Sequence, residues 1–304
     1  MTGTEPGDHA AAHPAADAPL ALWRDAGAIL VESLWWDAAR RAMRWTDIST
    51  GELHTSPIDG APDGSDDEVL RLPPPLASFQ PNRTGGLVVA LGDRVVVVDE
   101  RGTITRTVAE IDHRHGELRL NEGKCDPFGA FVVGSMNLRD ETPDGALYRV
   151  HADGRLETLL GGLSVANGFE WSDDGATFYF TDTTVKTVYR APYSADGPLG
   201  EPVALLTGLP SDGLARDRDG GFWSGLYGEG AVVRRTAAGA VTDRIDLPAP
   251  NITSVAFGGD DLATLFVGSA REQLAEGELA THPSSGGIFA LDTGRHGHPV
   301  NSFG

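Results

Sequence analysis

The chain has 304 residues, with 24 basic and 44 acidic side chains and a net charge of −20 at neutral pH. Its length allows two average domains or one large β-structure. The basic residues are almost all arginine, since Lys124 and Lys186 are the only lysines, and no extended basic run occurs. This composition argues against nucleic acid as a partner.

The beginning of the chain has no feature of a targeting segment. Residues 1–19 are rich in Ala, Pro and Asp and lack both a basic start and an apolar signal-peptide stretch. We interpret them as a disordered tail ahead of one folded domain, residues 20–304. Cys125 is the only cysteine, so no intramolecular disulfide is possible, and no later segment is long and apolar enough to cross a bilayer. We therefore expect a cytoplasmic protein that does not bind membranes.

One pattern recurs along the chain: a small or polar first residue, an apolar-alternating run, a Gly/Asp turn and a second apolar run. The last four clear starts are 46, 45 and 41 residues apart, and the first two are 89 apart, about two units. The missing unit is assigned to "GGLVVALGDRVVVVDE". The starts of the six units are Glu32, Gly85, Asn121, Asn167, Asp212 and Thr253.

Further strand-like pieces follow each pair, so each unit holds about four strands. Repeats of about 40–50 residues with four short antiparallel strands are typical of propeller blades. Only "AREQLAEGELA" (270–280) has helical character, and it could equally be a loop. The sequence thus predicts an all-β fold, a six-bladed β-propeller with four-stranded antiparallel blades. We expect residues 28–34 or the "GGIFAL" strand (286–291) to join the first and last blades.

The innermost strand of each blade lies along the central channel, so its first residue should reach one mouth of that channel. Glu32, Asn121, Asn167 and Asp212 then converge there with oxygen-bearing side chains. Each alone could simply cap a strand or shape a turn, but four at one repeat position favour a shared site. Clustered carboxylates need a compensating charge, and their oxygens suit Ca²⁺, Mg²⁺ or Mn²⁺, with Zn²⁺ and Fe²⁺ also possible.

Several of these segments also resemble a known family. They are "VESLWWD" with "WTDI", "RLNEGKCDPFGAFVVGSM", "ANGFEWSDDGATFYFTDT", "SDGLARDRDGGFW", "TSVAFGGDDLATLFVGSA" and "GGIFAL". Their order resembles that of the regucalcin, gluconolactonase and luciferin-regenerating enzyme family of six-bladed propellers, from about residue 28 to 292. The resemblance implies one divalent metal ion, Ca²⁺ foremost, held by Glu32, Asn167 and Asp212 with waters. It also implies that Arg119 and Asn121 bind the substrate.

The activity implied by the resemblance is opening of a sugar lactone such as gluconolactone, xylonolactone or arabinonolactone. The metal would polarise the ester carbonyl, and Asp212 would accept the proton of the attacking water. The residues agree with a hydrolysis that needs no protein nucleophile, because no G-x-S-x-G motif occurs and Cys125 has no evident histidine partner. We expect a monomer or weak homo-oligomer whose partner is this small molecule.

Three positions depart from the family pattern. Leu34 stands in place of the usual proline and Glu122 in place of an aspartate, and both changes look tolerable. Arg139 lies in "GSMNLRDETPDG", which aligns with a loop over the site where some relatives carry an acidic substrate contact. A cation there could bind the substrate through a different hydroxyl pattern or through an anionic group.

Two other functions stay open on this scaffold. The same metal could polarise a phosphoryl oxygen in a phosphotriesterase-like or other ester hydrolase. Alternatively, the protein could be a non-catalytic calcium-binding propeller that serves as an interaction platform. The Arg119 and Asn121 pair beside the predicted metal ligands favours catalysis, because metal binding alone does not need it.

Overall fold

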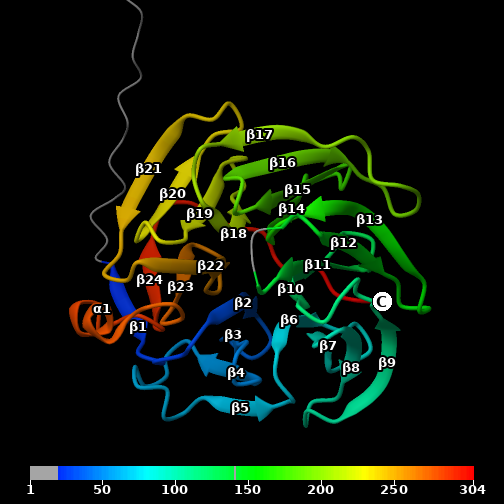
Figure 1. Ribbon diagram of the computed structural model, residues 1–304. Coiled ribbons are helices and arrows are strands. Elements are labelled where there is room, and N and C mark those ends of the chain that lie inside the picture. The colour runs from blue at the N-terminus through cyan, green and yellow to red at the C-terminus, as the bar shows by residue number, and fades with distance from the viewer. Residues whose placement is uncertain (1–19, 140–141) are drawn as a thin grey trace, which may run out of the picture.

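The computed structural model describes residues 20–139 and 142–304, and six antiparallel four-stranded sheets form a ring in it (Figure 1). The six-bladed propeller predicted from the repeats is confirmed. The predicted tail, residues 1–19, lies outside the described residues, so the division into tail and domain stays a prediction.

The blades follow one another along the chain, and in blades 1 to 5 the first strand is innermost. Blade 1 consists of β2 (Val31–Asp37), β3 (Ala42–Asp47), β4 (Glu52–Pro57) and β5 (Glu68–Arg71). Blade 2 consists of β6 (Leu76–Pro81), β7 (Leu87–Leu91), β8 (Arg94–Val98) and β9 (Ile104–Glu110). Blade 3 consists of β10 (Leu118–Cys125), β11 (Phe131–Asn137), β12 (Gly145–Val150) and β13 (Leu156–Leu163). Blade 4 consists of β14 (Ala166–Trp171), β15 (Thr177–Asp182), β16 (Thr187–Pro192) and β17 (Val203–Thr207). Blade 5 consists of β18 (Ser211–Arg216), β19 (Phe222–Leu226), β20 (Ala231–Arg235) and β21 (Val241–Asp246).

The sixth blade joins the two ends of the described chain. It contains β22 (Asn251–Gly258), β23 (Thr264–Ala270) and β24 (Ile288–Asp292), and its outer strand is β1 (Ala21–Arg24), which pairs antiparallel with β24. The "GGIFAL" strand takes part in closure as predicted. Residues 28–34 do not supply the closing strand, which is β1, but they do connect the first and last blades: Leu30 forms an isolated bridge with Ala270, and Val31 begins the innermost strand of blade 1.

A second correction concerns blade 2. Its innermost strand is β6, and the apolar run that begins at Gly85 forms β7 and β8 instead. β6 carries buried Ser78 and Gln80 and ends at a proline, so its apolar signal is weak. β7 is buried at every position and therefore gives the stronger pattern.

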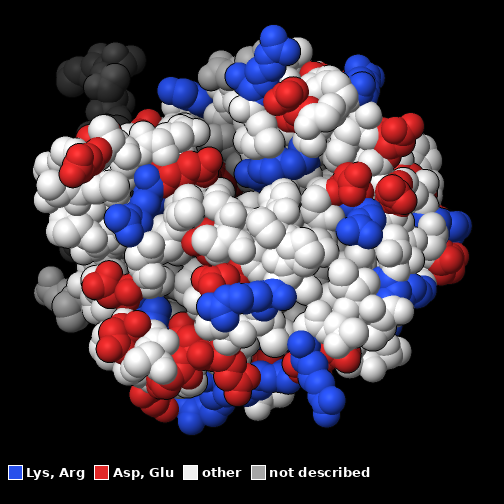
Figure 2. Space-filling view, turned by 60° about the horizontal axis from the view of Figure 1, so that its bottom comes forward, with Lys and Arg blue, Asp and Glu red and all other residues white. Residues whose placement is uncertain are grey.

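Helical structure is confined, within the described residues, to α1 (Glu276–Thr281), inside the ambiguous "AREQLAEGELA" segment. It is too short to cross a membrane, and no helix in the described part of the chain is long and apolar enough to do so. Figure 2 shows acidic and basic side chains interspersed on one face of the molecule rather than gathered by sign.

Aromatic pairs pack across successive blade interfaces. Trp35 of blade 1 meets the Phe79 ring of blade 2 edge-on, with ring centroids 5.9 Å apart. Tyr179 and Phe222 join blades 4 and 5 at 4.9 Å. These contacts bury large rings between sheets, and they hold the innermost strands around the channel at fixed separations.

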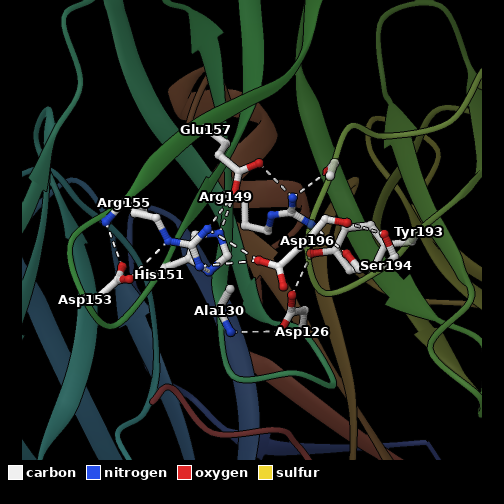
Figure 3. A network of polar contacts seen from close by, with 11 residues as sticks. Asp126, Ala130, Arg149, His151, Asp153, Arg155, Glu157, Tyr193, Ser194 and Asp196 are labelled. Atoms are coloured by element: carbon white, nitrogen blue, oxygen red, sulfur yellow. Dashed lines mark hydrogen bonds and ion pairs between the residues drawn. The ribbon is translucent and has the colours of Figure 1, made fainter.

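A polar network joins blades 3 and 4 (Figure 3). The Tyr193 hydroxyl donates to buried Asp126, with 2.6 Å between the oxygens. The guanidinium of Arg149 is 1% exposed, pairs with Glu157 at 2.8 Å, and donates to the Ser194 carbonyl oxygen at 2.7 Å. Since Arg149 lies on β12 and Ser194 follows β16, this cation ties the two blades together.

Replacing Arg149 tests the importance of this network for stability. Arg149→Met should lower the free energy of unfolding by about 2–3 kcal/mol, because it leaves buried acceptors without donors. Arg155→Gln is the matched control in the same network, since its side chain is 55% exposed and its loss should cost less than about 1 kcal/mol. Urea titration at neutral pH measures both, and equal losses would contradict this role for Arg149.

Candidate active site

The innermost strands share an irregularity next to the predicted site residues. The antiparallel register shifts between Glu32 and Trp35 in β2 and between Asn167 and Glu170 in β14. In β18 the shift follows Ser211, immediately before Asp212. A bulge leaves residues unpaired and bends the strand, so it can redirect a side chain away from the sheet's regular alternation.

Close approach of the innermost strands depends on the first residue inside the bulge. Gly168 has φ 55°, and a Cβ there would lie 2.7 Å from the Asp212 carbonyl oxygen. Only glycine fits this position without moving β18. The equivalent Ser33 also adopts a left-handed conformation (φ 55°), and its hydroxyl accepts a hydrogen bond from Phe79 N. The backbone thus brings Asn167 and Asp212 to adjoining positions.

Aspartates at the ends of two second strands fix the entry of the chain into the innermost strands. Asp47, at the end of β3, accepts a hydrogen bond from Ile29 N at 2.8 Å, just before β2. Asp182, at the end of β15, accepts one from Ser164 N at 2.9 Å, just before β14. The aspartates in "WTDI" and "FTDT" therefore position the strands that carry site residues.

A cavity of about 440 Å³ lies at this mouth of the channel, within the size range of small-molecule sites. It is lined by every residue predicted for the site: Glu32, Arg119, Asn121, Arg139, Asn167 and Asp212. The carboxylates and amides are 4–8% exposed, and Arg139 lies exposed at the rim. The structure thus brings these residues together, while their roles stay predictions.

Hydrogen bonds connect the polar side chains of the cavity in one row. Arg119 Nη1 donates to Asn121 Oδ1 at 2.6 Å, and Asn121 Nδ2 donates to Asn167 Oδ1 at 2.8 Å. Asn167 Nδ2 in turn donates to Thr183 Oγ1 at 3.0 Å. Because its amide nitrogen is engaged by Thr183, Asn167 presents its oxygen to the cavity, with one lone pair beyond the bond from Asn121.

The two carboxyl groups have strongly perturbed acidity. Burial raises the pKa of Asp212 to about 8; the charge of Glu122 adds to this effect, and Arg119 opposes it. Burial also raises the pKa of Glu32 well above its usual range, with the charges of Asp212 and Glu122 as further causes. Asp212 Oδ1 is buried and has no hydrogen-bond partner among the described residues. The charge of Arg119 therefore compensates the two anionic forms only in part.

This donor set fits a hard divalent cation. Two carboxylates and an amide oxygen are ligands that Ca²⁺ and Mg²⁺ accept, with water or substrate completing the shell. The described residues contain no group of three or more His, Cys, Asp or Glu side chains arranged around one metal position. The site would therefore depend on Asn167 as well as on Glu32 and Asp212.

The repeat did not reveal every residue of the cavity. The lining also includes Thr183, Lys186, Tyr227, Glu272 and Gln273. These residues follow the second strand of their blades, β15, β19 or β23. Since neighbouring strands are antiparallel, a second strand ends at the mouth where the first begins. Attention to residues after each second strand would have found them.

Glu272 is the third carboxylate at this mouth, and its backbone is held on both sides. Its N–H donates to the Ile29 carbonyl oxygen at 3.0 Å, and its own carbonyl oxygen accepts from Asn251 Nδ2 at 2.9 Å. Burial raises the pKa of Tyr227, and the charge of Glu272 is the next largest cause. Glu272 and Tyr227 thus place an acceptor and a neutral phenol on the same wall.

Known proteins resemble the chain over most of its length. A 6-deoxy-6-sulfogluconolactonase of Pseudomonas putida is 35% identical over 268 residues, 86% of this chain and 90% of that protein. An L-arabinolactonase of Azospirillum brasilense is 35% identical over 93% of this chain and 94% of its own length. The crystal structure of a calcium-binding protein, regucalcin, from Agrobacterium tumefaciens superposes with a TM-score of 0.85 at 29% identity, covering 96% of this chain and 98% of that one.

The profile of one family spans the blades that carry the cavity. It is described as the SMP-30/Gluconolactonase/LRE-like region and matches residues 30–271, from β2 to the end of β23. The resemblance seen in the sequence motifs is thereby confirmed, and the chain belongs to the SMP-30/gluconolactonase/LRE-like family.

Proposed function

We propose that the protein is a divalent-metal-dependent lactonase that opens the ring ester of an aldonolactone by hydrolysis. The observation that carries the proposal is the pair of buried carboxylates, Glu32 and Asp212, in one cavity with the hydrogen-bonded Arg119 and Asn121. Relatives named as lactonases support it, since they match this chain over most of both lengths. Gluconolactone, xylonolactone and arabinonolactone are the substrates we propose, within carbohydrate metabolism.

Glu32, Asn167 and Asp212 would hold the metal ion, and Ca²⁺ is our first choice. When bound, such an ion supplies positive charge to the ester carbonyl oxygen, an effect of several kcal/mol in the transition state. A divalent charge would also favour the ionised forms of the two carboxyls, whose burial otherwise favours protonation.

Asp212 is the proposed general base. Its Oδ1 makes no hydrogen bond to any described residue, so it is free to accept a proton from a water that attacks the carbonyl carbon. The base keeps its orientation because β18 is packed against Gly168 of the neighbouring blade. On ring opening, the acquired proton would pass to the ring oxygen that leaves the carbonyl carbon, and the new carboxylic acid would lose its own proton to solvent.

Arg119 and Asn121 are the proposed substrate-binding pair. Arg119 Nη1 is occupied by Asn121 Oδ1 and by the Leu120 carbonyl oxygen, which fixes the plane of the guanidinium. Its remaining N–H groups can donate to substrate oxygens. A lactone ring with several hydroxyls offers such oxygens around the reacting carbonyl.

Removing the proposed base tests the mechanism directly. Asp212→Asn should lower lactone turnover by at least about 100-fold, because a positioned base contributes about 10²–10⁴. Asp219→Asn is the control on the same blade, since Asp219 is exposed and pairs with Arg295. A pH-stat assay on several aldonolactones measures both variants.

Three outcomes of that assay have distinct meanings. Turnover by Asp212→Asn at the wild-type rate would refute the assignment of the base. Wild-type activity on phosphate triesters but not on lactones would favour the phosphotriesterase-like alternative. Metal binding by the wild-type protein without any turnover would favour the non-catalytic calcium-binding alternative.

Metal dependence gives a second prediction, with a defined pH direction. Because burial raises the pKa of Asp212 to about 8 in the metal-free protein, its carboxyl must lose a proton before it can bind a cation. Calcium affinity should therefore rise between about pH 6 and pH 8, and binding should release protons. Chelation should abolish lactone turnover, and added Ca²⁺, Mn²⁺ or Zn²⁺ should restore it.

Calorimetry of Ca²⁺ binding in two buffers of different ionisation enthalpy measures the protons released. A buffer-dependent binding enthalpy at pH 7 is expected. Affinity that does not change with pH, with no proton release, would contradict the coupling of these carboxyls to the metal.

A further inference from the structure

Two basic side chains from neighbouring blades line the rim of the cavity. Arg139 follows β11 of blade 3, and Lys186 lies in the turn between β15 and β16 of blade 4. Both are exposed, and the side chain of neither forms an ion pair or hydrogen bond with any other residue in 20–139 or 142–304. They are therefore available to a ligand in the cavity.

The opposite end of the channel shows a different arrangement of charges. A cavity of about 260 Å³ there is also lined by two basic side chains. Lys124 Nζ lies 2.6 Å from Glu170 Oε1, and Arg216 Nη1 lies 2.6 Å from Asp173 Oδ1. The cations of that cavity are thus neutralised by carboxylates of the protein, whereas Arg139 and Lys186 have no such partner among the described residues.

The position of Lys186 is fixed relative to the candidate metal ligands. Its N–H donates to the Thr183 carbonyl oxygen at 3.1 Å, and its carbonyl oxygen accepts from Gly208 N at 2.9 Å. Thr183 also accepts the hydrogen bond from Asn167 Nδ2. Lys186 has φ 53°, a left-handed conformation that costs a non-glycine residue about 1 kcal/mol or more. A lysine occupies this turn position, although glycine or asparagine would fit its backbone conformation better.

Arg139 is anchored through its backbone. Its N–H donates to Asn137 Oδ1 at 2.8 Å, and the preceding Leu138 N–H donates to the Glu117 carbonyl oxygen at 2.9 Å. These bonds set the path of the chain up to the rim and leave the guanidinium unengaged. Arginine can bind an oxyanion through two parallel N–H donors, and lysine adds a point charge.

The side chains that line the cavity therefore differ between its buried end and its exposed end. Its buried end holds Glu32, Asn167 and Asp212, where the ester carbonyl must lie under the proposed function. Its more exposed part holds Arg139 and Lys186, with the half-buried carboxylate of Glu272 also in the lining. A net charge of −20 repels anionic molecules in general, so local positive charge at the mouth matters most for an anionic substrate. A neutral sugar would gain little from it.

We propose that the cavity selects lactones that carry an anionic oxygen group at the end remote from the ring carbonyl, and that Arg139 and Lys186 bind this group. A phosphate, a sulfonate or a carboxylate shares the required chemistry. The proposal rests on the lactonase function proposed above and specifies its substrate class.

The test compares δ-gluconolactone with its 6-phosphate. Proton release at constant pH gives kcat/KM for each lactone with the metal-loaded wild-type protein, the double variant Arg139→Gln/Lys186→Gln, and Arg190→Gln. Arg190 is the matched control, because it is an exposed arginine on β16 that does not line the cavity. The corresponding 6-sulfonate and 6-carboxylate lactones then identify which anion is preferred.

We expect the wild-type protein to prefer the phosphorylated lactone and the double variant to lose at least tenfold in the ratio of the two kcat/KM values. Added NaCl should lower the wild-type ratio, since exposed charges are screened. Arg190→Gln should keep the wild-type ratio.

Three results would overturn the proposal, and only the last of them would also overturn the lactonase function. The anion site would be contradicted if the wild-type protein hydrolysed the neutral lactone and showed no preference for any anionic one. It would also be contradicted if the double variant lost equal activity on both lactones. Neither result would contradict the lactonase function. Absence of turnover on every lactone would remove the proposed function and the substrate class together.

Discussion

The close approach of the innermost strands at one channel mouth is the constraint on which the rest of the structure depends. Gly168 has no Cβ, so β14 and β18 can lie close enough to place Asn167 beside Asp212. The bulges that follow Glu32 and Asn167 then let these side chains enter the channel. The predicted site residues Glu32, Asn121, Asn167 and Asp212, from four blades, thereby meet in one cavity, although they are up to 180 residues apart in the chain.

Burial imposes an electrostatic cost on this arrangement, and the same cost gives the site its chemistry. Glu32 and Asp212 would each be a weaker acid than usual in the protein alone. A cation that binds only to the folded protein would offset the cost and stabilise the fold by mass action. Such a cation would also explain why Asp212 Oδ1 has no hydrogen-bond partner among the described residues, which is unusual for a buried carboxylate.

The sequence predicted the fold well because each blade repeats one pattern of strands and turns, and this pattern placed Glu32, Asn121, Asn167 and Asp212 at one mouth. The prediction of the innermost strand failed in blade 2. The apolar run from Gly85, which forms β7 and β8, has a stronger strand pattern than β6, the more polar strand that is in fact innermost. Residues after the second strands, such as Tyr227 and Glu272, have no repeated residue type to mark them. Their position at the channel mouth follows from the antiparallel order of the strands. The raised pKa of Asp212 follows from its burial, which exists only once the blades have assembled.

Closure of the ring by β1 has a consequence for how the protein reaches its native state. Ala21 pairs with Ala290, so the sixth sheet needs two segments that are separated by most of the described chain. Contacts of such long sequence separation form late, because loop closure must precede them. Blades 3 to 5 can pack as the chain emerges, but Glu32 is held against blade 6 only once β22 and β23 are available. The complete ligand set is therefore a property of the finished ring, and a nascent or truncated chain would lack it.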